Sequence, residues 1–353
     1  MKNLTKRELM AYVGDISQVL GVSEFVYSSG KSKGIRAYRV NNGRGLDFTV
    51  LVDKCLNIPY LSFKGYNIGF VSKVGLCAPE FYQEDGVRGY LRNFEAGFLT
   101  TCGLTYMGSP CVEPDGRKLG LHGPISNTPA ENASADVVWD GDVANIIIKG
   151  KVKEACLFDE HLVLSRVMSV NSLENTMTIN DKVENLGFKK QPLMLLYHFN
   201  FGYPMLDNCT RVYTNFDKII ARDSHSEKGI NNCDVFCKPV VGYQEEVFFR
   251  MMSDKGRKDA IVVIHNEELN LGVIFEFDAT ALPILNHWKN PAAGDYGLGI
   301  EPGTSHVGGR ERARKEGLLM YIEPGETKNY SISIKFSDDE SEIKKYINLV
   351  INS

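Results

Sequence analysis

The sequence predicts an all-β protein, a sandwich or a barrel. From about residue 24 onward, short segments rich in Val, Ile, Phe, Tyr and Thr alternate with clusters of Gly, Asn and Asp. Many short strands separated by turn signals are typical of such folds. The strand–helix–strand rhythm of a parallel α/β protein is absent, and no Pro/Gly/Ser-rich linker divides the 353 residues. We therefore expect one large domain over residues 1–353, although two packed β-halves would show the same strand spacing.

A short helix is expected at each end of the chain. Within residues 1–21, Thr5 and Glu8 form a capping-box pattern, apolar residues follow at helical spacing, and Gly21 suits the end of the helix. Within residues 337–353, Ser337 and Glu340 form a second capping-box pattern ahead of an apolar face. Neither helix is expected to carry chemistry.

The strands are expected between these helices. Residues 177–183 show the clearest signal, because polar and apolar side chains alternate there as they do along a strand with two different faces. The other predicted strands cover residues 48–52, 58–63, 144–149, 162–170, 212–215, 260–265, 272–277, 318–322 and 330–336. The stretch 76–137 is instead irregular and rich in glycine, but its many aromatic residues argue against disorder. We expect an ordered loop system around a site there.

Composition excludes several classes of function. The net charge is −4, the pI is about 6.0 and no basic stripe is present, so a nucleic-acid partner is not expected. No apolar run approaches the roughly 20 residues of a membrane helix, and the first ten residues are polar. The eight cysteines are scattered without a C-x-x-C pair, which indicates reduced thiols and no zinc site. A soluble, cytoplasmic protein is expected.

His198 stands in the most unusual strand of the chain. The segment 195–207 reads LLYHFNFGYPMLD, an apolar run that ends at Gly202 and Pro204 and therefore reads as a buried strand. His198 and Asn200 place polar groups where the pattern predicts core, and buried polar groups require hydrogen bonds. A core histidine bonded to a backbone carbonyl would give the same pattern.

Two further residues stand in unusual contexts. His122 is flanked by glycines in the sequence GLHGPISN, which allows a ligand or another backbone to approach closely. Glu301 comes at the end of a strand, just before Pro302 and Gly303, and so would lie at the rim of a sheet. A solvent-facing turn histidine and an exposed loop glutamate are the simpler alternatives.

Four segments together resemble one known family. They are TTCGL at residues 100–104, GLHGPISNTPAE at 120–131, LLYHFNFGYPMLD at 195–207 and IEPGT at 300–304. In a β-rich chain this set is similar to the aldose 1-epimerase (galactose mutarotase-like) superfamily, and more closely to its DUF4432 branch. The resemblance runs from about residue 45 to residue 333. It implies a β-supersandwich fold and a cleft of the size of a sugar.

The resemblance also implies a mechanism. Glu301 would be the general base that takes the proton from the anomeric hydroxyl, and His198 the general acid that protonates the ring oxygen. His122 would bind the sugar near that oxygen. The open-chain aldehyde would then rotate and close on its other face, with both roles reversed. Carboxylate and imidazole groups suit this acid/base chemistry, and neither a metal nor an organic cofactor is needed.

The sequence departs from the branch in two places. Lys54 stands in DKCLNI where the branch often has DRGLDI, which removes a guanidinium fork. Pro124 stands where arginine is common. Lys54 therefore remains a candidate binder of substrate, together with other polar or aromatic residues in or near the expected site: Arg92, Asn93, Asn200, Asp278, Trp288 and Lys289. A surface ion pair for Arg92, a core position for Trp288 and a turn role for Asp278 are the alternatives.

Two other functions remain open at this point. One is a carbon epimerase or isomerase of a keto sugar or uronate, in which Lys54 adds an acid, a base or a carboxylate binder, or in which His122, His198 and Glu301 hold a metal. The other is a sugar-binding protein without turnover. In each case the partner is a small carbohydrate, and exposed strand edges are compatible with a homodimer.

Overall fold

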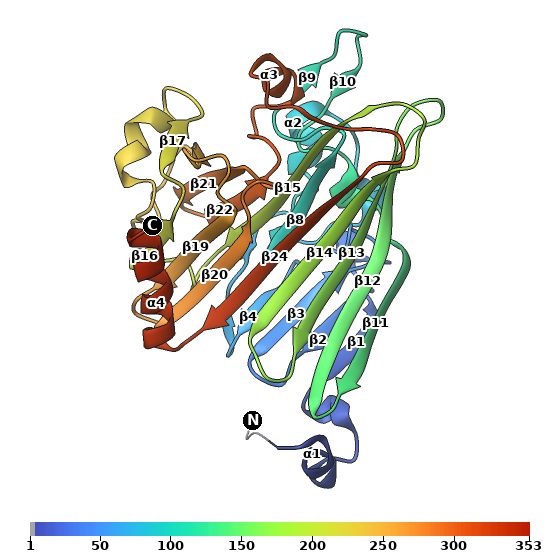
Figure 1. Cartoon of the computed structure of the whole chain (residues 1–353), viewed down its shortest axis with the longest axis vertical. Helices are drawn as coiled ribbons and strands as arrows, with labels where there is room; N and C mark the ends of the chain where they lie inside the picture. The colour runs from blue at the N-terminus through green and yellow to red at the C-terminus, as the bar shows by residue number, and fades with distance from the viewer. Residues whose placement is uncertain (1–3) are drawn as a thin grey trace.

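The computed structural model describes residues 4–353, and it confirms the predicted all-β class (Figure 1). Its largest sheet has eight antiparallel strands and is called the large sheet below. In spatial order these are β11 (Glu131–Asp140), β12 (Val143–Ala155), β13 (His161–Asn171), β14 (Thr176–Asn185), β24 (Thr327–Ser337), β20 (Leu271–Asp278), β19 (Asp259–Asn266) and β16 (Thr210–Thr214).

A second sheet, called the site sheet, carries His198 and Glu301. Its order is β17 (Lys218–Ala221), β18 (Glu246–Met251), β21 (Ile284–Ala292), β22 (Asp295–Gly303), β15 (Gln191–Phe201) and β23 (Met320–Ile322). Strand β8 (Leu99–Leu104) pairs with the edge of β15 that β22 does not occupy. Strand β15 is therefore central, and its residue 198 lies between two neighbouring strands.

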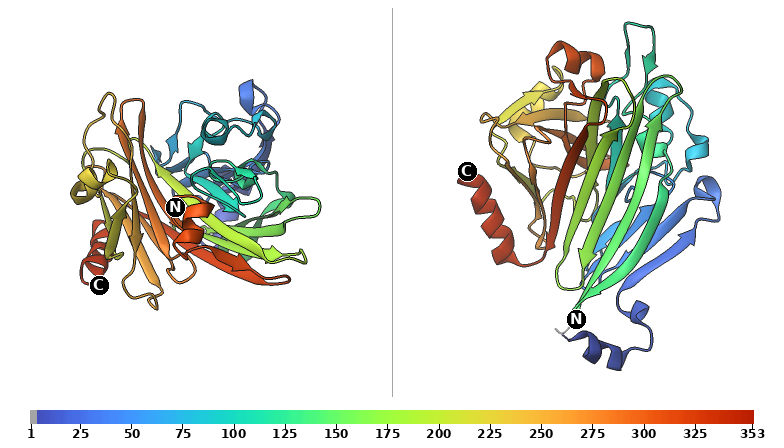
Figure 2. Two further views of the ribbon diagram at one scale, coloured as in Figure 1. Left: turned by 90° about the horizontal axis from the view of Figure 1, so that it is seen from above. Right: turned by 45° about the vertical axis from the view of Figure 1, so that its right-hand side comes forward.

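A third sheet comes from the N-terminal part of the chain. It is formed by β1 (Gly21–Val26), β2 (Arg36–Asn41), β3 (Leu46–Leu51), β4 (Leu61–Phe63) and β5 (Tyr66–Asn67). Two small pairs complete the strands, β6 (Phe70–Val71) with β7 (Ala96–Gly97) and β9 (Cys111–Val112) with β10 (Lys118–Leu119). Figure 2 shows the long strands of the large sheet as one layer, with the blue and cyan N-terminal segments on one side of it.

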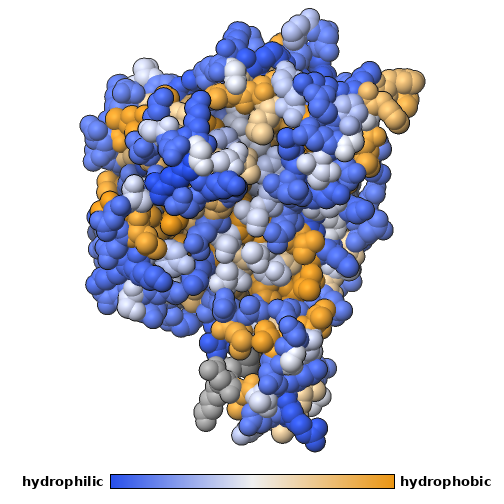
Figure 3. Space-filling model, viewed as in Figure 1, coloured by the Kyte–Doolittle hydropathy of each residue, from blue (hydrophilic) through white to orange (hydrophobic). Residues whose placement is uncertain are grey.

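The main core joins these three sheets. Its buried apolar side chains come from alternate positions of the long strands, including Tyr197, Phe199 and Phe201 of β15 and Ile300 of β22. Successive side chains of a strand point to opposite faces, so His198 and Glu301 face away from this core. The polar residues in the apolar segment 195–201 thus have a topological explanation. Figure 3 shows a largely hydrophilic outer surface with scattered apolar patches.

Helices are few and short. They are α1 (Lys6–Tyr12), α2 (Gly86–Leu91), α3 (Arg310–Lys315) and α4 (Glu340–Ile351), with 3₁₀ turns at Ile16–Gln18, Gly30–Ser32, Pro79–Phe81, Ile125–Asn127 and Ser226–Asn232. The Thr5–Glu8 capping box is present. The second predicted capping box is wrong, because Asp339 caps α4 through the amides of Ser341 and Glu342. Ser337 ends β24 and donates from Oγ to Glu342.

All ten predicted strand ranges overlap observed strands, but two extend beyond the observed strand by two residues or more. Only residues 61–63 of the range 58–63 and residues 320–322 of the range 318–322 are paired in strands β4 and β23. The stretch 76–137 contains β8 and the start of β11, neither of which the sequence pattern revealed. No helix within residues 4–353 has the length and apolar character required to cross a bilayer. The single-domain organisation stays a prediction.

Candidate active site

Strand register brings His198 and Glu301 together. In the antiparallel pair of β15 and β22, Phe199 lies opposite Ile300, so the preceding residue His198 lies opposite the following residue Glu301. The Nε2 atom of His198 is 3.2 Å from Oε1 of Glu301. Both residues are buried, with 6% and 2% of their surface exposed. Two residues that are 103 positions apart in the chain thus bring an imidazole and a carboxyl group into contact, a candidate acid/base pair that is called the acid/base pair below.

Glycines on β22 make room for this pair. A Cβ atom on Gly299 would lie 2.3 Å from Oε1 of Glu301 and 3.0 Å from Cβ of Trp288. A Cβ atom on Gly297 would lie 3.0 Å from the Trp288 ring. Trp288 is the register partner of Gly299 on β21. In the segment 297–301, GLGIE, the face of the strand toward the pair therefore carries two glycines without side chains and then the carboxylate of Glu301. On the opposite face, Leu298 and Ile300 enter the core.

His122 reaches the pair from the loop after β10. Its φ is +61°, and its backbone is held by a hydrogen bond from its N–H to the carbonyl of Gly108 and another from the N–H of Gly103 to its carbonyl. Its ring centroid is 5.6 Å from that of His198 and 5.1 Å from that of Tyr90. The strained loop conformation directs an imidazole beside the acid/base pair.

These groups line one cavity of about 580 Å³. Aromatic rings surround His198, with the centroid of Phe94 at 5.3 Å and that of Trp288 at 6.2 Å. The lining also includes Phe70, Ser72, Lys73, Val74, Val87, Tyr90, Leu91, Ser109, Pro110, Leu121, His122, Arg222, Glu245, Val247, Asn290, Asp295, Glu301 and Val307. The volume and the mixed apolar and polar lining are typical of a small-molecule site.

Burial controls the proton on the acid/base pair. Removal from water raises the pKa of Glu301 well above its usual value; the nearby carboxylate of Glu245 raises it further and Arg222 lowers it. Burial also lowers the pKa of His198, assisted by His122, and it lowers the pKa of His122 to about 4. Near pH 7 both imidazoles are therefore neutral, and burial favours the protonated form of the Glu301 carboxyl group. The form that burial favours is the one in which the pair carries a single proton, on Glu301.

The family model for the domain of unknown function DUF4432 matches residues 32–336, which is most of the chain. This chain belongs to the DUF4432 family. The match confirms the resemblance inferred from the four sequence motifs. Among curated proteins, no match was found.

Solved structures of similar shape share the mutarotase-like fold with this DUF4432 protein. A candidate aldose 1-epimerase from Klebsiella pneumoniae has a TM-score of 0.89 at 24% identity, over 99% of this chain and 90% of that one. A galactose mutarotase-like protein from Clostridium acetobutylicum has a TM-score of 0.65 at 17% identity, over 91% and 99%. Galactose 1-epimerase from Lactobacillus acidophilus has a TM-score of 0.58 at 14% identity, over 90% and 99%. At these identities the likeness establishes the fold.

Of the residues selected from the sequence of this DUF4432 protein, four meet in the cavity: His122, His198, Trp288 and Glu301. Asn200 lies next to them on β15, where its side-chain amide donates to the carbonyl of His198 at 3.0 Å. It is fully buried and is not among the described residues that line the cavity.

Five other selected residues also lie outside the described cavity lining. Lys54 is buried in an ion pair with Glu95, and Asn93 is buried as an acceptor for the thiol of Cys77. Arg92 is exposed and lies 3.7 Å from Asp85.

The last two, Asp278 and Lys289, are held by structural contacts. Asp278 caps the turn at Thr280, which matches the turn alternative, and Lys289 donates to the carbonyl of Asn232 from the face of β21 opposite Trp288. Contacts within the protein occupy the polar groups of Lys54, Asn93, Asp278 and Lys289, while Arg92 is exposed. The substrate-binding roles of these five residues stay predictions.

The structure also reveals polar residues that sequence reasoning missed. Glu245 accepts a hydrogen bond from the indole N–H of Trp288 at 2.7 Å and another from Arg222 at 2.9 Å. At the cavity rim, Lys73 forms an ion pair with Asp295 at 2.7 Å. Each of these charged residues stands in a segment without motif or periodicity, so no local signal distinguishes it from an ordinary surface charge.

The same region holds side chains of the types that bind metal ions. Within residues 4–353, no group of three or more His, Cys, Asp and Glu side chains is arranged as a metal-binding cluster. His122, His198 and Glu301 meet in the cavity, but His198 and Glu301 contact each other through their reactive atoms. The metal-binding alternative therefore gains no support from the arrangement of these side chains.

Proposed function

We propose that this DUF4432 protein is an aldose 1-epimerase-like enzyme that interconverts the anomers of a sugar by acid/base ring opening. The observation that carries the proposal is the contact of 3.2 Å between His198 and Glu301 inside a buried cavity of about 580 Å³. The anomeric hydroxyl and the ring oxygen are both bonded to C1. An acid and a base that act on them must therefore both lie within hydrogen-bond reach of the same end of the sugar.

The shared proton explains how the two groups exchange roles. In ring opening, Glu301 as carboxylate takes the proton of the anomeric hydroxyl, the C1–O1 bond becomes a carbonyl, the C1–O5 bond breaks, and His198 as imidazolium protonates O5. This step leaves Glu301 protonated and His198 neutral, which is the form that burial favours in the free protein. Ring closure on the other face reverses both transfers. The site needs one proton throughout.

His122 and Trp288 have supporting roles in this proposal. His122 lies beside His198 and has a low pKa, so it stays neutral and contributes a hydrogen-bonding imidazole without adding a charge that repels the imidazolium of His198. The Trp288 ring lies 6.2 Å from the His198 ring, and its indole N–H is fixed by Glu245. It offers a flat surface for the C–H face of a sugar.

The first prediction tests the acid/base pair. Replacing His198 with alanine, or Glu301 with glutamine, is expected to lower the rate of anomer interconversion by about 10²–10⁴-fold, because each variant removes one of two proton-transfer groups. The rate is measured by NMR across a panel of aldoses and uronates. Matched controls are His161→Ala and Glu323→Gln, which lie outside the described cavity lining. Acceleration by the wild type that survives in either pair variant would exclude this assignment.

The same samples distinguish the two alternative functions, a sugar-binding protein and a carbon epimerase. Sugar binding without any acceleration by the wild type, retained in Glu301→Gln, would identify a sugar-binding protein instead. Acceleration restricted to exchange of a carbon-bound proton would identify a carbon epimerase.

The second prediction concerns pH. Only the one-proton form of the His198–Glu301 pair is competent. As pH falls, the pair gains a second proton when His198 is protonated, which happens only well below the usual histidine pKa of about 6.5. As pH rises, the pair loses its proton when Glu301 ionises, which happens only well above the usual glutamate pKa of about 4.5. The profile of kcat/KM for free enzyme is therefore expected to be bell-shaped, with activity lost on both sides. In Glu301→Gln any residual activity depends on the imidazolium of His198 alone, so it should fall as pH rises and show no loss on the acid side. A profile in wild type that keeps rising with pH would contradict the one-proton mechanism.

A further inference from the structure

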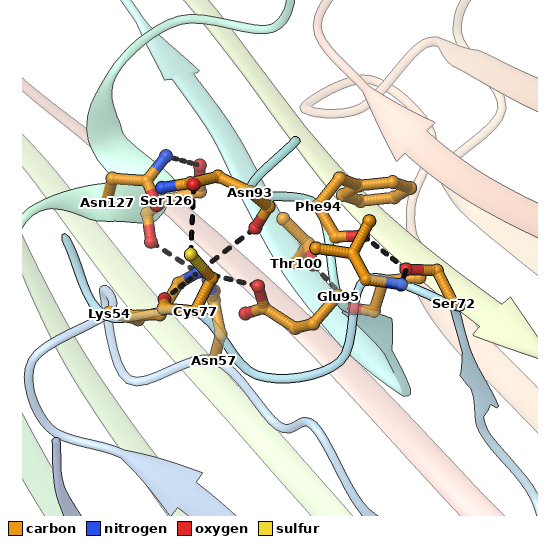
Figure 4. A network of polar contacts seen from close by, with 12 residues as sticks. Lys54, Asn57, Ser72, Cys77, Asn93, Phe94, Glu95, Thr100, Ser126 and Asn127 are labelled. Carbon is orange, nitrogen blue, oxygen red and sulfur yellow. Dashed lines mark hydrogen bonds and ion pairs between the residues drawn. The ribbon is translucent and has the colours of Figure 1, made fainter. Parts of the chain in front are cut away.

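A fully buried lysine lies behind one wall of the cavity. Lys54 follows β3 and is 1% exposed. Its Nζ atom is 2.5 Å from the carboxylate of Glu95, 3.1 Å from the carbonyl of Cys77 and 3.3 Å from the carbonyl of Asn93 (Figure 4). An ammonium group has three donors, so all of its hydrogen-bonding capacity is used within the protein. Lys54 has no donor left for a substrate.

The acceptors of Lys54 belong to two segments that line the cavity. Residues 72–74 and the aromatic residues 90 and 94 are part of the lining. Ser72 donates from Oγ to the carbonyl of Phe94 at 2.6 Å and from its N–H to the carbonyl of Glu95 at 3.0 Å. The thiol of Cys77 donates to Oδ1 of Asn93 at 3.0 Å. Lys54 thus ties these two segments to each other and to the end of β3.

Phe94 connects this network to the acid/base pair. In the chain it stands between Asn93, whose backbone carbonyl accepts a hydrogen bond from Lys54, and Glu95, whose carboxylate does the same. Figure 4 shows the ring of Phe94 on the side away from Lys54. The ring centroid of Phe94 is 5.3 Å from His198 and 5.2 Å from Tyr90, and Tyr90 in turn is 5.1 Å from His122. A movement of residues 93–95 would therefore shift the aromatic packing around both histidines.

We propose that Lys54 is a positioning residue that holds Phe94 against His198 by anchoring residues 93–95 from behind. An apolar side chain at position 54 could fill the same space but could not bind three oxygen acceptors on two segments. Since a buried charge requires a partner, Lys54 and Glu95 act as one unit. Only the kinetic part of the test below depends on the proposed function.

The experiment compares four proteins: wild type, Lys54→Met/Glu95→Gln, Phe94→Leu and the combination of all three changes. The double change removes both charges, so that no uncompensated charge remains buried. The first measurement is the NMR resonance of the His198 ring, assigned by its disappearance in His198→Gln. The second is kcat and KM separately. The control is Lys335→Met/Glu342→Gln, a half-buried Lys–Glu pair between β24 and α4, outside the described cavity lining.

Positioning through Phe94 predicts a specific pattern. The His198 resonance should shift in Lys54→Met/Glu95→Gln, should not shift in the control, and should shift no further when the double change is added to Phe94→Leu. In Lys54→Met/Glu95→Gln, kcat should fall by roughly 10- to 100-fold, in line with a displacement of about 1 Å at a catalytic group. The combined variant should have the same kcat as Phe94→Leu.

Two results would overturn the proposal. One is an unchanged His198 resonance in a folded Lys54→Met/Glu95→Gln protein, and the other is additive effects of the double change and Phe94→Leu. If the double variant does not fold, Ser72→Ala takes its place. This change removes the hydrogen bond from Oγ to the Phe94 carbonyl and the one that Oγ accepts from the N–H of Val74 at 3.2 Å, and it is judged by the same resonance and the same additivity. If no sugar is turned over by wild type, the proposed function fails, while the NMR comparison still decides the role of Lys54.

Discussion

Replacing Gly299 with alanine is expected to abolish most of the proposed anomer interconversion while the protein remains folded. The added Cβ atom would lie 2.3 Å from Oε1 of Glu301, so the carboxylate must leave its contact with His198. The atom that has to move is the end of a flexible side chain, which relocates at little cost in stability. The Cβ atom of Trp288 would lie 3.0 Å from the added atom, and a shift of a few tenths of an ångström relieves this contact. A loss of about 10²-fold or more in kcat is expected, close to that of Glu301→Gln.

Two alanine substitutions make this prediction specific. Gly14→Ala places a Cβ atom in open space and should change neither activity nor stability. Gly297→Ala meets the ring of Trp288 at 3.0 Å instead of the carboxylate, so it should affect substrate binding more than kcat. The NMR rate and the thermal unfolding midpoint of all three variants provide the measurement. An active Gly299→Ala enzyme would show that the observed position of Glu301 is not required for catalysis.

Replacing Arg166 with methionine is expected to produce the largest loss of stability, about 3–5 kcal/mol. The side chains of Arg166 and Asp181 are both fully buried, with Nη2 of the arginine 2.6 Å from the carboxylate. Arg166 also donates to Oγ1 of Thr101 and to the carbonyl of Cys55, and Asp181 accepts from the hydroxyl of Tyr197. Removing the guanidinium leaves a buried carboxylate without its counter-charge. The free energy of unfolding is measured by denaturant titration.

Controls for this prediction separate burial from charge. Arg39→Met removes an ion pair with Asp47 at the surface and should cost no more than about 1 kcal/mol. Arg166→Met/Asp181→Leu removes both buried charges and should recover much of the lost stability. Equal losses in Arg166→Met and Arg39→Met would show that the buried pair contributes no more than a solvated one.

Local patterns were sufficient for the all-β fold class. Strict alternation over residues 177–183 identified β14, and the Thr5–Glu8 pair identified the start of α1, because both signals arise between neighbours in the chain. The boundaries of β4 and β23 were misplaced since pairing with a distant strand, not local composition, decides where a strand ends. The cap of α4 went to Asp339 because Ser337 was already part of β24.

The candidate catalytic residues were found from the sequence because they stand in long motifs. His122, His198 and Glu301 carry the resemblance to the DUF4432 family, and all three line the cavity. The sequence by itself thus determined the fold class and the family, and it selected His198 and Glu301, whose proposed roles stay predictions. The role of Gly297 and Gly299 became visible only in the structure, where a Cβ atom at either position would meet Trp288 or Glu301.

Only the tertiary structure decided which other charges reach the cavity. Lys54 has the sequence context of a substrate binder, yet packing brings Glu95 and two carbonyls to its ammonium and closes it off from solvent. Arg222 and Glu245 have no motif, yet the site sheet places them beside Trp288. The contact of a charged side chain depends on segments far away in the chain, and the free energy of burying a charge depends on those partners. Neither quantity is encoded in the neighbouring residues.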